Sequence, residues 1–105
     1  MKIAPIFGTA TVATSGTPVQ IGAAYNGTLG TGNKNIPCRK ITFIADAANS
    51  GRVSLGTKAS HPVSLAAGGQ VTIEFPEYGN ELDLLDYWAD ASANGQIINF
   101  IAYRG

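Results

Sequence analysis

Six of the seven acidic residues of this 105-residue chain fall between Glu74 and Asp90. Paired carboxylates can hydrolyse a glycosidic bond or hold calcium, and both uses need carboxyl groups that converge to within about 5 to 10 Å. One short local segment seldom supplies that convergence, so we interpret the cluster as an acidic face turned to solvent or to a partner. Its members are Glu74, Glu77, Glu81, Asp83, Asp86 and Asp90.

The other residue types that carry chemistry are isolated. His61 is the only histidine, and the sequence identifies no serine or cysteine as its partner in a nucleophilic triad. Cys38, the only cysteine, excludes an internal disulfide and a thiolate metal cage, and it is typical of a small buried apolar residue. We therefore expect no enzyme activity, no metal site and no cofactor.

The glycine-rich stretch at residues 27–34 superficially resembles a phosphate-binding loop. Its lysine, Lys34, does not directly follow the last glycine, and no serine or threonine comes after it to hold magnesium. The sequence therefore gives no support to nucleotide binding.

Four aromatic residues offer a different kind of site. Trp88, together with Tyr25, Tyr78 and Tyr87, could form a platform on which a sugar ring stacks. Aromatic side chains also supply most of the buried area in small β domains, so the competing interpretation places Trp88 in the core or in a protein interface. We favour the core or interface interpretation.

The composition of the chain restricts its partners. It is 45% hydrophobic but only 13% charged, and its formal net charge is zero. Without a net field, neither nucleic acid nor an anionic membrane is expected as a partner. The N-terminus is not a convincing signal peptide, and no apolar run approaches the roughly 20 residues of a spanning helix. We expect a protein made and kept in a cytoplasm, or carried out of it inside a larger particle.

Alternation of apolar and polar residues runs through most of the chain and predicts β-strands. We expect three hairpins, at residues 39–57, 9–23 and 61–75, because each contains two alternating runs joined by turn-forming residues. A short helical turn near residues 81–84 leads into a strand, and a last strand over residues 96–103 is central because both its faces are apolar. About eight short strands predict an all-β fold, an antiparallel β-sandwich or jelly roll.

We expect one domain with one core. The apolar positions that fall in phase on the clearest strands predict that core: Ile41, Phe43, Val53, Leu55, Ile73, Phe75, Phe100 and Ala102. Residues 9–105 form the sandwich, and residues 1–8 form an N-terminal arm, because Pro5 confines this segment to an edge strand or an arm. Residues 22–35 form a long flexible loop rich in glycine and asparagine. A neighbouring molecule is expected to order the arm and the loop.

Four segments follow one another along the chain. They read ATVATSGTPVQ at residues 10–20, CRKITFIADAANSGRVSLG at 38–56, PVSLAAGGQVTI at 62–73 and DYWADASANGQIINFIAY at 86–103. In this order they resemble small β-sandwich structural proteins of tailed bacteriophage virions. The resemblance covers most of residues 9–103 and lies in turns and core positions, while the loop at 22–35 and the Pro5 arm depart from it. It implies a protein that decorates or cements heads, or forms part of a collar or tail.

We therefore expect a non-enzymatic structural protein of a bacteriophage virion, synthesised in the bacterial host cytoplasm. It would bind the major capsid protein or a tail or collar protein, without nucleic acid or membrane. The alternative is a host-recognition or carbohydrate-binding module. The expected partner-binding residues are Ile3, Pro5, Phe7, Tyr25, Leu29, Tyr78 and Trp88.

A homo-oligomer is also expected, because the charges divide along the chain. Residues 1–73 hold six basic residues and one acidic residue, and residues 74–105 hold six acidic residues and one basic residue. If the two parts form different flanks of the sandwich, opposite signs meet between copies. If strands from both parts interleave, the charges mix in space.

Overall fold

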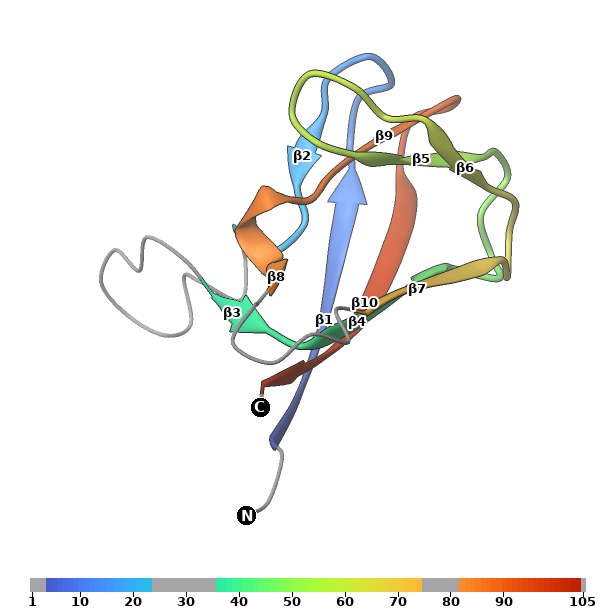
Figure 1. Cartoon of the computed structure of the whole chain (residues 1–105). Coiled ribbons are helices and arrows are strands. Elements are labelled where there is room, and N and C mark those ends of the chain that lie inside the picture. The colour runs from blue at the N-terminus through green and yellow to red at the C-terminus, as the bar shows by residue number, and fades with distance from the viewer. Residues whose placement is uncertain (1–3, 24–35, 75–81, 105) are drawn as a thin grey trace.

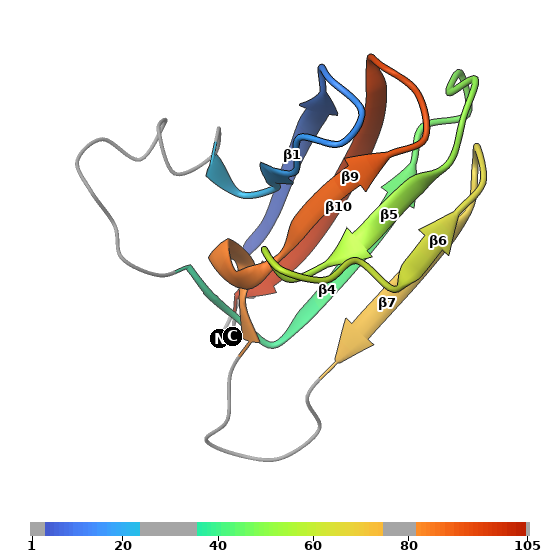
Figure 2. The same cartoon turned by 90° about the horizontal axis from the view of Figure 1, so that it is seen from above.

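Two four-stranded antiparallel sheets pack face to face and enclose the core (Figures 1 and 2). The computed structural model describes residues 4–23, 36–74 and 82–104. Sheet A has the strand order β1-β10-β4-β7, sheet B has the order β2-β9-β5-β6, and a small third sheet pairs β3 with β8. The strands are β1 Ala4–Val12, β2 Val19–Gln20, β3 Pro37–Cys38, β4 Lys40–Ala45, β5 Val53–Gly56, β6 Val63–Leu65, β7 Gln70–Glu74, β8 Leu82–Asp83, β9 Trp88–Ala91 and β10 Gln96–Arg104.

The strands of the two main sheets pair in a nested order. The first pairs with the last, β1 with β10, and the next pairs inward are β2 with β9, β4 with β7, and β5 with β6. Further pairing of β10 with β4 and of β9 with β5 joins these pairs into two open four-stranded sheets. The chain is therefore one long hairpin rolled into two layers, which is the jelly-roll form of the predicted all-β sandwich.

The three predicted hairpins are wrong as hairpins, although the alternation within their strands is right. β4 and β5, β1 and β2, and β6 and β7 each lie in different sheets, so the segments between them are arches that carry the chain from one layer to the other. Residues 92–95 form a fourth arch, from β9 to β10. The only hairpin between consecutive strands of one sheet among the described residues joins β5 to β6.

Arches and hairpins share the same sequence pattern because both need inward-facing apolar residues and a turn between them. The arches are held instead by contacts from distant parts of the chain. The Asn49 side chain donates to the Ile97 carbonyl and accepts from the Ile97 N–H, each at 2.8 Å, so it continues the ladder where β4 has ended. Gln96, the one buried polar residue described, accepts from the Gly51 N–H at 2.8 Å and donates to Ser50 Oγ at 3.1 Å.

Replacing Asn49 with alanine is expected to lower the free energy of unfolding by about 1 to 3 kcal/mol. The Ile97 N–H would lose its described partner and depend on water at the half-buried end of β10, while the Ile97 carbonyl would keep only the hydrogen bond of 3.0 Å from the Asp46 N–H. Chemical denaturation measures the change. The matched control is Asn94→Ala, whose side chain accepts a single exposed hydrogen bond from the Ser15 N–H; equal losses for the two variants would contradict this role of Asn49.

The predicted core is confirmed at the residues that the structure describes. Six of the eight predicted residues are buried: Ile41, Phe43, Val53, Leu55, Phe100 and Ala102. Ile73 is partly buried and packs against the same cluster, and Phe75 lies outside the described residues. Cys38 is also buried, as expected for a small apolar residue.

Two predicted segments differ from the structure. Residues 4–8, assigned to an N-terminal arm, are the first half of β1, and Pro5 is accommodated because β1 is an edge strand. The helical turn begins three residues later than predicted, as a 3-10 helix η1 at Leu84–Asp86, because the Asp83 carboxylate caps it by accepting from the Leu85 N–H at 3.0 Å. Among the described residues no helix has the length and apolar character to cross a membrane.

The long loop is described only at its ends. Ile21, Gly22 and Ile36 are buried, and a Cβ at Gly22 would lie 2.9 Å from Leu84 Cγ, so η1 packs directly on the backbone there. The remainder of the predicted loop, residues 24–35, lies outside the described residues.

The basic and acidic parts of the chain do not form separate flanks. β10 lies between β1 and β4, and β9 lies between β2 and β5, so strands from both parts interleave in both sheets. Lys40 on β4, for example, is the register partner of Glu74 on β7. The charge-divided, head-to-tail contact expected from the sequence is therefore not available.

Candidate functional site

The predicted partner-binding residues fall on two opposite surfaces. Pro5 and Phe7 lie on β1 and point to the outer face of sheet A, where Phe7 is 67% exposed. Trp88 lies on β9 in sheet B and is half-buried. The other four predicted residues, Ile3, Tyr25, Leu29 and Tyr78, lie outside the described residues.

The outer face of sheet A is apolar along its β1 and β10 side. The registers place Phe7 beside Ile101, and Pro5 beside Tyr103. Ile44 of β4 adjoins Asn99 of β10, and Ile97 completes the row along β10. We call this set the apolar strip: Pro5, Phe7, Ile44, Ile97, Ile101 and Tyr103.

Four members of the apolar strip were not among the predicted partner-binding residues. Ile97, Ile101 and Tyr103 belong to the second apolar face of the last strand, and two apolar faces were interpreted as the mark of a central strand. β10 is indeed central in sheet A, but within the described residues only its inner face packs on the core. The sequence pattern of an exposed apolar face was therefore present in the last strand. Ile44 lies on the same outer face, because it alternates with the buried residues of β4.

Hydrogen bonds across the strands fix the polar part of this face. Thr9 donates to Asn99 at 2.8 Å, and Thr42 and Thr72 share a hydrogen bond of 2.9 Å. The ammonium group of Lys40 lies 5.6 Å from the centre of the Tyr103 ring, within cation–π range. These contacts hold the polar side chains of the face in place, so a partner that binds here would lose little entropy in ordering them.

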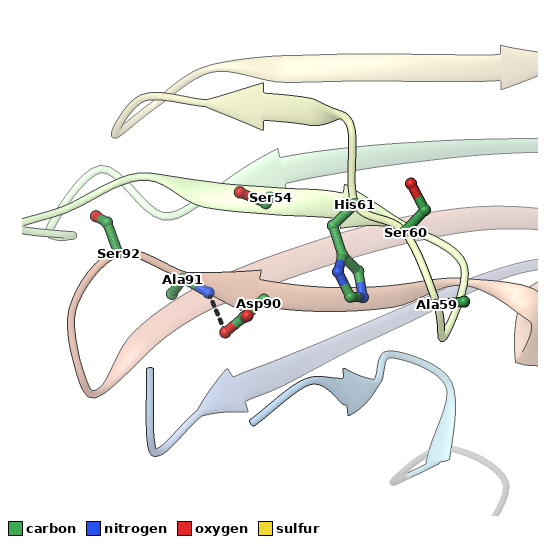
Figure 3. Close-up of a pocket in the computed structure, with 7 residues that line it drawn as sticks. All are labelled: Ser54, Ala59, Ser60, His61, Asp90, Ala91 and Ser92. Atoms are coloured by element: carbon green, nitrogen blue, oxygen red, sulfur yellow. Dashed lines mark hydrogen bonds between the residues drawn. The ribbon is translucent and has the colours of Figure 1, made fainter. Parts of the chain in front are cut away.

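A polar hollow of about 320 Å³ lies on the outer face of sheet B (Figure 3). The β5–β6 turn folds back over β5, and a Cβ at Gly56 would collide with the Ser60 carbonyl oxygen. This turn brings His61 over β9, beside Asp90 (Figure 3). The residues that line the hollow are Ser54, Ala59, Ser60, His61, Asp90, Ala91 and Ser92.

The hollow brings a serine, a histidine and an aspartate together, but not as a catalytic relay. His61 Nε2 is buried and has no hydrogen-bond partner among the described residues. Asp90 Oδ1 instead accepts from the backbone N–H groups of Gly16 at 2.9 Å and Ala91 at 2.8 Å. Ser92 Oγ accepts from the Arg52 N–H. A nucleophile needs a base within hydrogen-bond reach, and this arrangement supplies none.

The acidic cluster does not form a metal site among the described residues. No group of three or more His, Cys, Asp and Glu side chains there is placed to hold a metal ion. Asp83 caps η1 and also accepts from the Ile36 N–H at 2.9 Å, and Asp90 binds the arch after β1. These carboxylates tie segments of the fold together.

The aromatic residues that the structure describes do not form a sugar-stacking platform. Tyr87 packs against the core with its ring centre 5.1 Å from that of Phe43, and burial, with a smaller contribution from the charge of Asp86, raises the pKa of its hydroxyl. Tyr103 belongs to the opposite sheet. Trp88 lies outside the core, but the ammonium of Lys58 sits 5.4 Å above its ring.

Comparison with known proteins gives no family. No protein-family model matches the chain, and no curated protein matches it. Among solved structures, it is similar to the cryo-EM structure of the giant freshwater prawn Macrobrachium rosenbergii extra small virus (XSV) VLP, with a TM-score of 0.45 and 13% sequence identity over 98% of this chain and 80% of that chain. A likeness of this degree shows neither a family nor a function.

Proposed function

We propose that this chain is a non-enzymatic structural protein of a virion, specifically of a bacteriophage, and that it attaches to the capsid or to a tail or collar protein through the apolar strip on sheet A. The observation that carries the proposal is Phe7, a large apolar side chain that is 67% exposed beside Ile101 of β10, on the face that also carries Ile97 and Tyr103. Surface apolar residues that gather in one patch mark a protein interface more often than single ones do.

Three other observations support an attachment role. Jelly rolls are common in viral capsid proteins, although the same fold also serves lectins and cupins, so the fold alone does not decide the function. The chain has only 13% charged residues, which suits a surface that is partly covered by another protein. The resemblance of its turn and core segments to phage virion proteins points to the same class.

The proposal predicts that Phe7→Ser reduces incorporation of the chain into virus particles by about tenfold or more, because loss of a central aromatic anchor typically costs at least 2 kcal/mol of binding. Quantitative mass spectrometry of purified particles measures this. Val63→Ser is the matched control, since Val63 is the other exposed large apolar residue described and lies on sheet B. Absence of the unmodified chain from particles, or equal losses for both variants, would refute the proposal.

A carbohydrate-binding module is the second candidate, and one observation favours it. Trp88 lies outside the core, on the same outward face of β9 as Asp90, which follows it by two residues and lines the polar hollow. Binding of the purified chain to a glycan array, abolished by Trp88→Ala and unaffected by Phe7→Ser, would favour this function over attachment through sheet A.

A further inference from the structure

The outer edge of β1 carries unpaired backbone groups. Val12 accepts a hydrogen bond of 2.8 Å from the Gly95 N–H, so its backbone groups point toward β10. The N–H and C=O of one strand residue point to the same side, and the side alternates along the strand. Phe7, Thr9 and Thr11 therefore direct their N–H and C=O groups away from β10, and no described strand pairs with them.

Among the four sheet edges, only that of β1 combines length with a lack of charge. The edge strands of sheet B are short, with two residues in β2 and three in β6. β7 on the other edge of sheet A ends in Glu74. β1 has nine residues, from Ala4 to Val12, none of them charged. Short length, charge and proline are the usual devices that stop edge strands from pairing with other chains. β1 is neither short nor charged, and its one proline, Pro5, lies next to the start of the strand and leaves the edge from Phe7 to Thr11 unblocked.

We propose that β1 pairs antiparallel with β1 of a second copy of this chain, so that the two A sheets join into one eight-stranded sheet. A two-fold axis beside Gly8 gives the greatest overlap, with Phe7 opposite Thr9 of the second copy. In this register Phe7 and Thr9 exchange both backbone hydrogen bonds across the seam, and the Thr11 N–H donates to the Pro5 carbonyl. The Thr11 carbonyl finds no donor there, because proline has no N–H. The two Phe7 rings lie at diagonal positions, which aromatic side chains can bridge.

One observation favours a second copy over a strand of another protein. A two-fold axis brings each strand next to itself, so any charge near the axis would meet its own sign; β1 has no charge to oppose this pairing. The charged residues on the strands of sheet A lie on β10, β4 and β7, at least one strand away from the proposed seam.

The inference does not depend on attachment to a virion. Edge pairing uses backbone groups of β1, and the purified chain alone should show it. Attachment uses side chains of the apolar strip and is measured on particles. A chain that dimerises but never enters particles would refute only the proposed function, and a monomeric chain that enters particles would refute only the edge pairing.

The test is Thr9→Pro, which removes an N–H from the free edge without touching the ladder to β10. Pro5 already occupies the same side of β1. The matched control is Thr72→Pro on β7. Ala45 exchanges backbone hydrogen bonds with the turn at residues 68–69, so the backbone N–H and C=O groups of the odd-numbered residues of β4 and β7 point toward each other. Thr72 is an even-numbered residue of β7, so its N–H points to the free edge, as that of Thr9 does. Both threonines make one cross-strand side-chain hydrogen bond, so the two variants are closely matched.

Sedimentation velocity over a concentration series measures the outcome. We expect the unmodified chain to sediment at twice 10.9 kDa. Thr9→Pro should raise the dimer dissociation constant by about tenfold or more, because the proline removes hydrogen bonds between the copies and its ring obstructs their approach. Thr72→Pro should leave that constant unchanged. A monomeric unmodified chain at millimolar concentration, or equal weakening by both substitutions, would overturn the proposal.

Hydrogen exchange keeps the test decisive if Thr9→Pro does not fold. In the unmodified chain the amides of Phe7, Thr9 and Thr11 should exchange slowly at high protein concentration and at least about tenfold faster after dilution. The amides of Ile6 and Ala10, which face β10, should be protected at both concentrations. Fast exchange at residues 7, 9 and 11 under all conditions would overturn the pairing.

Discussion

Truncation of Phe43 to alanine is expected to lower the free energy of unfolding by about 3 to 5 kcal/mol. Phe43 is fully buried at the middle of β4, where its register partners are Phe100 on β10 and Val71 on β7. Its ring also contacts Tyr87, which follows η1. The side chain thus fills the space between sheet A and the segment that leads into sheet B, and neither layer can close over the cavity without losing its own register.

Chemical denaturation measures this effect, at a protein concentration low enough for the chain to be monomeric. Phe7→Ala is the matched control, because it removes the same atoms from a side chain that is 67% exposed on the same sheet. The control should change the free energy of unfolding by no more than about 0.5 kcal/mol. A loss below about 1 kcal/mol for Phe43→Ala would contradict its placement at the centre of the core.

The fold class was predictable because alternation states which side chains face inward. β4, β5 and β10 show this most clearly, since Ile41, Phe43, Val53, Leu55 and Phe100 are buried in the predicted phase. The same alternation does not state which strand is the neighbour. An apolar run, a glycine-containing turn and a second apolar run describe a hairpin and an arch equally well.

The pairing was not predictable because distant residues decide it. β1 pairs with β10 at the opposite end of the chain, and Asn49 holds its arch by bonding Ile97, 48 residues away. The residues of a turn do not indicate which distant strand will pair with the strands beside it. Gly16, Gly68 and Gly95 do adopt positive φ within three of the arches, so the sequence located these turns correctly while leaving their direction open.

The candidate site was predictable in part for a similar reason. Pro5 and Phe7 were predicted as partner-binding residues of an N-terminal arm, and Phe7 is exposed. Ile44, Ile97 and Ile101 join them only because β1, β10 and β4 are neighbours in sheet A. A surface assembled from three strands requires the strand order, and the strand order was the part of the fold that the sequence did not supply.

The second large effect concerns Gly8, where alanine is expected to lower the free energy of unfolding by about 3 kcal/mol, near the upper end for overpacked cores. Gly8 is the register partner of Phe100. The Phe100 ring lies directly over its backbone, and a Cβ at residue 8 would collide with Cζ and lie 2.5 Å from Cε1. Phe100 is itself buried, so its ring cannot move aside without displacing the core.

A double-mutant cycle separates this collision from a loss of backbone freedom. Leucine at position 100 has no atoms where Cζ and Cε1 of phenylalanine lie, so Gly8→Ala in the Phe100→Leu background should cost less than about 1 kcal/mol, a coupling of roughly 2 kcal/mol. If the alanine instead acted by restricting the chain, it would have the same effect in both backgrounds. Equal effects would show that the ring does not rest on Gly8, and the close approach of β1 to β10 would then need another cause.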